Sequence, residues 1–446
     1  MIDNAIRFGL NVWDLLRIGA CSYREYFKLK RMQYASRQKL NEMSMIKLRH
    51  LVRHAYHRVP FYRRLYDEKH LDPRIIKRVE DLRYLPITAK AMFRRAFPHR
   101  CLAQGYESRA IHNKTSGSTG EPFEFFNDRF ESPIMQASYM LFNTWIGVKT
   151  PSRFVHIRSP SKLSLKMVLR DKMVGRNRIS TLDINSGTIK GFVKTINRIE
   201  PAYIEGYTAS LVNASRLIKN SGLAINCRPK AIIATSEDLL EHHRALIESV
   251  FRCKVFNRYG SREFSGAVAQ ECGHCGGLHV NTSLCLLEVV DKDGEPVGEG
   301  EGGKVLITDL NNYTMPFIRY DIGDYAVKGP ERSECGRTFP LINRVRGREG
   351  YYIISKTGEK IPFLTISSTL FQRFADQVST YQFVQRRRGE LLLEIIPTKK
   401  FNEEVIEDIN KYLEETLHNF SLRVELVENI PPTSSGKTPF LITLNQ

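Results

Sequence analysis

The strongest chemical pattern in the sequence is a run of small hydroxyl and glycine residues that ends at a proline. The run is Thr115-Ser116-Gly117-Ser118-Thr119-Gly120-Glu121-Pro122. Its glycines let the backbone approach a ligand closely, and its hydroxyls donate hydrogen bonds without adding a charge. Phosphate oxygens accept from hydroxyls and backbone N–H groups together, so the run is typical of a phosphate-binding loop. A flexible surface loop has the same composition and stays open as an alternative, whereas a Walker A loop is excluded because no Gly-Lys-Ser/Thr follows.

Three later loops carry polar side chains that suit the rest of a nucleotide. They are Thr235-Ser236-Glu237, the segment 257–263 and Asp321-Ile322-Gly323-Asp324. The ring of Tyr259, beside Gly260, can stack on a base, and the Glu263 carboxylate can hold Mg²⁺ against phosphates. The Asp324 carboxylate can accept from both hydroxyls of a ribose. Each also has a structural interpretation, with Tyr259 in the core, Glu263 paired with Arg262, and Asp324 in a turn.

A separate group of sulfur and imidazole ligands lies between these loops. Cys272-Gly273-His274-Cys275 has the spacing of a zinc knuckle, His279 follows it, and Cys335 lies further on. Cys272, Cys275, His279 and Cys335 would make a tetrahedral structural Zn²⁺ site. The second half lacks a Cys-x-x-Cys pair of its own, so two free thiols in a turn remain the alternative.

The loops follow short apolar runs that we expect to be strands. Between residues 110 and 310, runs such as Ala231–Ala234 and Val255–Phe256 alternate with helical stretches near 130–146, 186–199, 208–220 and 237–252. This alternation predicts an α/β domain with a largely parallel sheet, in which ligands bind at the carboxyl ends of strands. Residues that suit helix N-caps are Thr88, Thr208 and Ser236.

The last hundred residues have the pattern of a small α+β domain. Tyr381–Arg387 and Leu391–Ile396 predict a hairpin across Arg388-Gly389-Glu390, a helix follows Asn402, and Leu422–Leu426 predicts another strand. We place the domain boundary near residue 348. The predicted organisation is a helical extension over 1–44, the α/β domain over 45–348 and the α+β domain over 349–446.

The composition favours anionic partners and a reducing compartment. The 446 residues include 67 Lys and Arg against 48 Asp and Glu, a net charge of +19. Eight cysteines without a secretory signal predict reduced thiols and a cytoplasmic protein. No apolar run approaches the roughly 18 residues that span a bilayer. Residues 1–30 have apolar positions near helical spacing followed by basic residues, which predicts either peripheral membrane contact or a helix packed on its own domain.

Five motifs occur in an order that identifies a family. They are the run 115–122, Arg258-Tyr259-Gly260-Ser261-Arg262-Glu263, Tyr320-Asp321-Ile322-Gly323-Asp324, Arg346-Gly347-Arg348 and Pro432-Thr433-Ser434-Ser435-Gly436-Lys437. From about residue 45 to the end, the chain resembles the adenylate-forming superfamily of acyl-CoA synthetases, luciferases and peptide-synthetase adenylation domains. It looks most like the phenylacetate–CoA ligase branch and its relatives in capsular polysaccharide gene clusters. The resemblance implies an α/β fold, with a large multi-sheet N-terminal adenylation domain and a small, mobile C-terminal lid domain.

The resemblance also implies a role for each matched residue. Lys437 would bridge the substrate carboxylate and the α-phosphate, Glu263 would bind Mg²⁺, and Thr119 would act with the phosphate loop. The implied nucleotide-binding residues are Thr115, Ser116, Gly117, Ser118, Thr119, Gly120, Ser236, Glu237, Arg258, Tyr259, Gly260, Asp324 and Arg348. The sequence departs from the family where Asp321-Ile322 replaces Arg-Thr and where Glu349-Gly350-Tyr351 replaces an acidic hinge. These departures concern the second half-reaction more than adenylation.

The implied activity is an AMP-forming ligase that uses ATP, Mg²⁺ and a small-molecule carboxylic acid. The expected acceptor is the thiol of coenzyme A, and the alternative is an amine on a sugar or amino acid in surface polysaccharide assembly. A homodimer and no nucleic-acid partner are also expected. A second alternative is a non-catalytic basic protein that binds nucleic acid or a membrane, which has only the net charge in its support and lacks recognition motifs.

Overall fold

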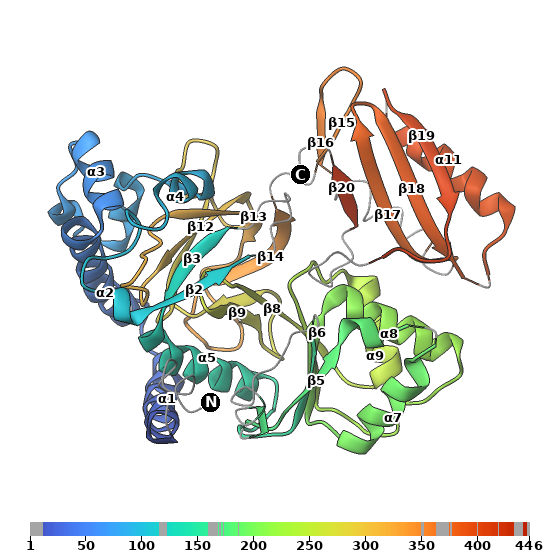
Figure 1. Cartoon of the computed structure of the whole chain (residues 1–446), viewed down its shortest axis with the longest axis horizontal. Helices are drawn as coiled ribbons and strands as arrows, with labels where there is room; N and C mark the ends of the chain where they lie inside the picture. Colours follow the sequence, from blue (N-terminus) through green and yellow to red (C-terminus); the bar gives the residue numbers. More distant parts are fainter. Residues whose placement is uncertain are drawn as a thin grey trace, which may run out of the picture. The chain divides into compact units, whose positions relative to one another are not determined.

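A computed structural model describes most of the chain. The described residues are 12–115, 123–158, 168, 171–172, 174–185, 187–348, 352–362, 374, 377–398, 400–417, 419–431 and 440–443. Their contacts divide the chain into two units (Figure 1). Unit 1 is Met1–Thr115, Phe123–Thr150 and Arg258–Val345, and unit 2 is Ser116–Pro122, Pro151–Asn257 and Arg346–Gln446.

Unit 1 begins with helices that pack their apolar faces inward. They are α1 (Val12–Met32), α2 (Arg37–Arg58), α3 (Pro60–Glu68) and α4 (Lys90–Ala96), and α5 (Ser132–Trp145) follows later. Ser36 caps α2 by accepting from the N–H of Lys39. Leu48, Leu51 and Ala55 recur at helical spacing along α2 and are completely buried. Leu29 and Met32 at the end of α1 share a core cluster with Leu141 and Phe142 of α5. The described part of α1 therefore packs on its own unit.

The sheet of unit 1 is largely antiparallel. Its strands are β8 (Val255–Ser261), β9 (Gly266–Glu271), β10 (Leu278–Val280), β11 (Cys285–Val290), β12 (Gly302–Asp309), β13 (Tyr320–Lys328) and β14 (Leu341–Arg348). They lie in the order β11-β12-β13-β14-β10-β9-β8, and β1 (Thr88–Ala89) joins β13 in parallel. A separate hairpin pairs β2 (Ala110–Lys114) with β3 (Glu124–Asp128).

Unit 2 contains the parallel strands. They are β4 (Phe154–Arg158), β5 (Arg176–Ser180), β6 (Tyr203–Tyr207) and β7 (Ala231–Thr235), in the order β7-β6-β4-β5. The helices α7 (Ile189–Ile199), α8 (Thr208–Asn220) and α9 (Glu241–Phe251) supply the rest of this core. The predicted parallel sheet is thus confined to residues 154–235. In unit 1, β9 pairs antiparallel with β8 and β10, and β12 pairs antiparallel with β11 and β13, because turns such as the one between β8 and β9 are too short for a crossover helix.

The C-terminal part of unit 2 matches the predicted hairpin, helix and strand. β17 (Val378–Arg387) and β18 (Glu390–Pro397) turn at Gly389, whose φ is +69°. Asn402 caps α11 (Glu403–Thr416) by accepting from the N–H of Val405. β19 (Ser421–Leu426) and β20 (Leu441–Thr443) complete the order β19-β18-β17-β20, and β15 (Tyr352–Ile354) pairs with β16 (Lys360–Pro362). The expected α/β fold with a smaller C-terminal α+β part is confirmed.

The three predicted N-caps are wrong, because each residue is used differently. Thr88 lies in β1 and donates from Oγ1 to the carbonyl of Ile318 at 2.9 Å. Thr208 is the first residue of α8, not its cap, and donates to the carbonyl of Glu237. Ser236 has a φ of +71° at the end of β7, and α9 begins only at Glu241. Among the described residues, no helix has both the length and the apolar character needed to cross a membrane.

Candidate active site and a sulfur–imidazole cluster

Two of the motif residues are joined by a short hydrogen bond. Tyr259 of β8 donates from its hydroxyl to Oδ2 of Asp324 in β13 at 2.7 Å, across 65 positions of sequence. Burial of the ring, followed by the charge of Asp324, raises the pKa of Tyr259 well above its ordinary value. The hydroxyl therefore stays protonated at neutral pH and acts as a donor. The pair brings a flat ring and a carboxylate together, as recognition of a nucleoside requires.

Glu263 lies in the turn between β8 and β9 and is only 3% exposed. Its Oε2 accepts from the hydroxyl of Ser261, and its Oε1 lies 3.7 Å from Nζ of Lys90 at the start of α4. The structural alternative, a pair with Arg262, is replaced by this pair with Lys90. Sequence reasoning missed Lys90 because the two residues are far apart in the chain.

A buried polar network supports the turn that carries Glu263. Asn127, at the end of β3, donates to the carbonyl of Glu263 at 3.0 Å. Ser265 donates to Oε2 of Glu131, which in turn accepts from the N–H of Asp128. Because the partners Asn127 and Glu131 come from β3 and the turn after it, the position of Glu263 depends on packing outside its own loop.

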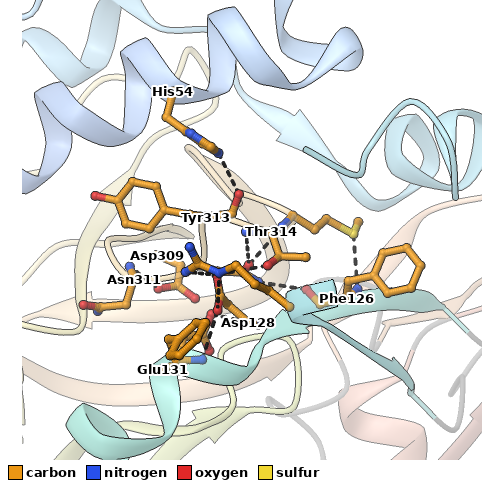
Figure 2. A network of polar contacts seen from close by, with 12 residues as sticks. His54, Phe126, Asp128, Glu131, Asp309, Asn311, Tyr313 and Thr314 are labelled. Carbon is orange, nitrogen blue, oxygen red and sulfur yellow. Dashed lines mark hydrogen bonds and ion pairs between the residues drawn. The ribbon is translucent and has the colours of Figure 1, made fainter. Parts of the chain in front are cut away.

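Asp128 is the centre of that network (Figure 2). Its carboxylate accepts two hydrogen bonds from Arg109, at 3.2 and 2.6 Å, and one from Oγ1 of Thr314 at 3.0 Å. Burial raises the pKa of Glu131 well above its ordinary value, and the nearby Asp309 adds to this shift. Burial also raises the pKa of Asp309 to about 6. Both carboxyls therefore bind a proton more tightly than they would in water.

The phosphate-loop motif is held at its base by the β2–β3 hairpin. The N–H of Thr115 donates to the carbonyl of Phe123 at 2.9 Å, and the N–H of Phe123 donates to Oγ1 of Thr115 at 3.3 Å. Ser116, Gly117, Ser118, Thr119 and Gly120 lie outside the described residues. The predicted loop thus starts and ends at two hydrogen-bonded residues of one hairpin.

Comparisons with known proteins agree with the motif order. The chain is 28% identical to "Phenylacetate-coenzyme A ligase" of Thermus thermophilus over 361 residues, 80% of each protein. It is 24% identical to "Protein CapK" of Staphylococcus aureus over 75% of each. The chain is thus similar to a phenylacetate–coenzyme A ligase and to CapK over most of its length. The predicted resemblance is confirmed.

The C-terminal part of the chain matches a family model of its own. Residues 353–443 match the model described as the CapK C-terminal domain. The fold of the whole chain is similar to that of 2-hydroxyisobutyryl-CoA ligase, solved in the postadenylation state in complex with R3-HIB-AMP. That similarity has a TM-score of 0.77 at 18% identity and covers 93% of this chain and 91% of the other. It shows that the chain has the same fold as that ligase.

The remaining motif residues have structural partners within the chain. Glu237 accepts from the N–H of Ala209 at 2.7 Å, so its carboxylate lies at the N-terminus of α8, where negative charge is favourable. Arg258 is buried and donates to Gln270 at 2.6 Å and to Asn143 at 3.0 Å, which joins β8 to β9 and α5. A Cβ at Gly260 would lie 2.2 Å from the carbonyl oxygen of Gly266, so the close approach of β9 requires glycine there. The nucleotide-binding roles of these residues stay predictions.

Two expected residues cannot be placed. Arg348 is the last residue of β14, but its side chain lies outside the described residues. Lys437, the expected catalytic lysine, also lies outside them. Their roles stay predictions.

The cysteine and histidine residues of the second sequence pattern converge in unit 1. One ligand atom each from Cys272, Cys275, His279 and Cys335 lies within 4.8 Å of all the others. Burial lowers the pKa of His279 to about 4, so the imidazole is neutral at neutral pH. At Cys335, burial raises the pKa, but hydrogen bonds from Ser333 and Arg337 outweigh it and bring the value down to about 7. The sequence expectation that these four residues meet is therefore correct.

Proposed function

We propose that this protein is an ATP-dependent ligase that activates a carboxylic acid as an acyl-adenylate and transfers the acyl group to coenzyme A. The bond between Tyr259 and Asp324 carries the proposal, because it joins two nucleotide motifs that are 65 residues apart. Similarity to a phenylacetate–coenzyme A ligase over 80% of the chain supports it. The solved relatives include 2-hydroxyisobutyryl-CoA ligase in complex with 2-HIB-AMP and CoA.

The reaction proceeds in two displacements. A carboxylate oxygen of the acid attacks the α-phosphorus of ATP, the bond to the bridging oxygen of the β-phosphate breaks, and pyrophosphate leaves. The sulfur of coenzyme A then attacks the acyl carbon, AMP leaves with the former carboxylate oxygen, and the thiol proton goes to solvent. Because carboxylate and triphosphate repel each other, the first step needs charge neutralisation and positioning more than a general base. Lys437 would supply a compact positive charge there.

The surroundings of Glu263 fit one ligand of a nucleotide-bound Mg²⁺. This buried carboxylate accepts from Ser261 and lies 3.7 Å from Lys90, so it already faces a cation. Mg²⁺ keeps several waters and phosphate oxygens and usually takes only one or two carboxylates from the protein. When bound, the ion would neutralise charge on the phosphates. Without the ion, the positive charge of Lys90 offsets the negative charge of Glu263.

Carboxylate-dependent exchange of labelled pyrophosphate into ATP tests the first half-reaction. The acids to be compared are aryl acetates, benzoates, fatty acids, amino acids and uronic acids. We expect exchange with one class and its loss, by about 100-fold or more, in Lys437→Ala. Lys356→Ala, a lysine in the turn between β15 and β16, is the control and should retain exchange. Exchange that persists in Lys437→Ala would contradict the role given to that lysine.

The acceptor needs a separate test because the C-terminal part matches the CapK C-terminal domain. With the active acid identified, coenzyme A and a panel of amino sugars and amino acids are offered one at a time. A thioester supports the coenzyme A ligase, and an amide supports an amine-acylating ligase. ATP binding without exchange for any acid, together with salt-dependent retention on heparin, would favour the non-catalytic alternative.

The domain organisation is also part of the proposal. We infer that residues 349–446 move as a lid that carries Lys437, which the separate core of the C-terminal strands and α11 supports. A homodimer, and peripheral membrane contact through the first residues of the chain, stay predictions. Light scattering and vesicle sedimentation would test them.

A further inference from the structure

The sulfur–imidazole cluster draws its four members from three segments of unit 1. Cys272 and Cys275 lie in the turn after β9, His279 lies in β10, and Cys335 lies in the loop before β14. The Sγ atoms of Cys272 and Cys275 are 3.2 Å apart, and those of Cys275 and Cys335 are 3.6 Å apart. Nε2 of His279 lies 3.2 Å from Cys275 and 3.3 Å from Cys335. Residues 60 positions apart thus present their ligand atoms to one point.

The histidine ring is oriented as a metal ligand would be. Its Nδ1 lies 3.4 Å from the carbonyl oxygen of Phe339, which can only accept, so Nδ1 carries the proton. The lone pair of Nε2 then faces the sulfurs of Cys275 and Cys335. A backbone carbonyl on the outer nitrogen is the common way to set the tautomer of a metal-binding histidine.

We propose that Cys272, Cys275, His279 and Cys335 bind one structural Zn²⁺. Zn–S and Zn–N bonds of about 2.3 and 2.0–2.1 Å put the corners of a tetrahedron roughly 3.5–3.8 Å apart, close to the separations of these atoms. Three thiolates and one imidazole select a soft, tetrahedral ion over Mg²⁺ or Ca²⁺. Four protein ligands complete the coordination, so the site is structural and binds no substrate. Binding releases the three thiol protons, and the resulting complex has one net negative charge.

Arg337 is placed to offset that charge and to connect the metal site with the N-terminal helices. It lies two residues after Cys335, and its guanidinium carbon lies 5.1 Å from the centre of the Trp145 ring. It also donates to Oε1 of Gln33 at 3.0 Å, and Nε1 of Trp145 donates to the same oxygen at 2.8 Å. Gln33 lies in the turn between α1 and α2. The ion would therefore hold the loop 333–339 against α5 and the end of α1.

Metal analysis of the full chain, purified without a histidine tag, tests the proposal. Elemental mass spectrometry should find about one zinc per wild-type chain. In Cys335→Ser, the zinc content per chain should be at least about tenfold lower. Cys227→Ser is the matched control, because Cys227 is also a half-buried thiol but lies in unit 2, outside the cluster. It should retain the metal. Wild-type zinc well below one per chain, or equal zinc in Cys335→Ser and wild type, would overturn the proposal.

A second measurement uses only the wild-type chain, so it does not depend on whether a variant folds. Reconstitution of the wild-type chain with Co²⁺ should give the intense visible bands of a tetrahedral site and sulfur-to-cobalt charge transfer in the near ultraviolet. Added Zn²⁺ should abolish both. A disulfide between Cys272 and Cys275, found by peptide mapping of the protein as isolated under reducing conditions, would overturn the metal site. Weak octahedral cobalt bands would do the same. Neither measurement depends on ligase activity, so failure of the metal site and failure of the proposed function are distinguishable.

Discussion

Unit 1 buries two clusters of acidic groups and stabilises them by different means. The carboxyls of Asp128, Glu131 and Asp309 receive hydrogen bonds from a guanidinium, hydroxyls and backbone N–H groups. Oxygen is a strong acceptor, so ordinary protein donors and retained protons can offset the cost of burial. In the sulfur–imidazole cluster, three thiols and one imidazole present their ligand atoms to one another, and thiol sulfur is a weaker hydrogen-bond acceptor than oxygen. The difference indicates that buried carboxyls can rely on the protein itself, whereas clustered thiols point to a metal ion.

Removal of the metal should have the largest effect on stability. Metal binding to a closed Cys/His site contributes directly to folding free energy. We expect a strong zinc chelator to lower the melting temperature of the first unfolding transition by roughly 10 °C, equivalent to several kcal/mol. Calorimetry checks this, with Cys335→Ser as a variant that should no longer respond. An unchanged melting temperature in the wild-type chain would mean that the thiols, like the carboxyls, need no ion.

Replacement of Asp128 should have the next largest effect. Asp128→Ala leaves the Arg109 guanidinium and the Thr314 hydroxyl without this partner, which should cost about 3–5 kcal/mol. Asp128→Asn retains one acceptor oxygen and should cost clearly less. Denaturant titration measures both. Equal losses of unfolding free energy in the two variants would show that the pairing of a negative charge with Arg109 does not decide stability here.

Asp309 should make stability depend on pH in an unusual direction. Its pKa is raised to about 6 from 3.8, mainly by burial, so the folded chain binds this proton more tightly than the unfolded chain. Its contribution is therefore most favourable below about pH 4 and is lost as pH rises through about 6, by about 2–3 kcal/mol. Asp309→Asn should remove that slope. Denaturant titrations of wild type and variant between pH 4 and 7 provide the measurement, and identical slopes would contradict the shift.

Loss of the Lys90 cation should have the smallest effect and should depend on ligand. Lys90→Met leaves the Glu263 carboxylate buried without its ion-pair partner, at a cost of about 1–2 kcal/mol. Magnesium with ATP should restore more stability to the variant than to the wild type, because the metal would replace the lysine as the neutralising cation. Thermal shift with MgATP, and with ATP in chelator as the control, measures this. An equal shift in both proteins would argue against Glu263 as a metal ligand.

Features that depend on a few neighbouring residues could be predicted from the sequence. The turn at Gly389 requires a positive φ, and the Asn402 cap satisfies an N–H three residues along. The Cys-x-x-Cys spacing brings Cys272 and Cys275 together within one turn. The order of the nucleotide motifs identified the family, because their residue types reflect the chemistry of the ligand.

Tertiary structure alone decided which distant groups meet. Lys90 reaches Glu263, and Tyr259 reaches Asp324, only because α4, β8 and β13 belong to one unit. Thr88, which was expected to cap a helix, lies in β1 and pairs with β13. A hydroxyl can hydrogen-bond to several nearby groups, and packing decides which of them it contacts. Cys335 was a candidate by composition, but its place beside His279 follows from the pairing of β14 with β10. Local hydrogen bonds are encoded within a turn of chain, whereas strand pairing fixes contacts between residues that the sequence leaves far apart.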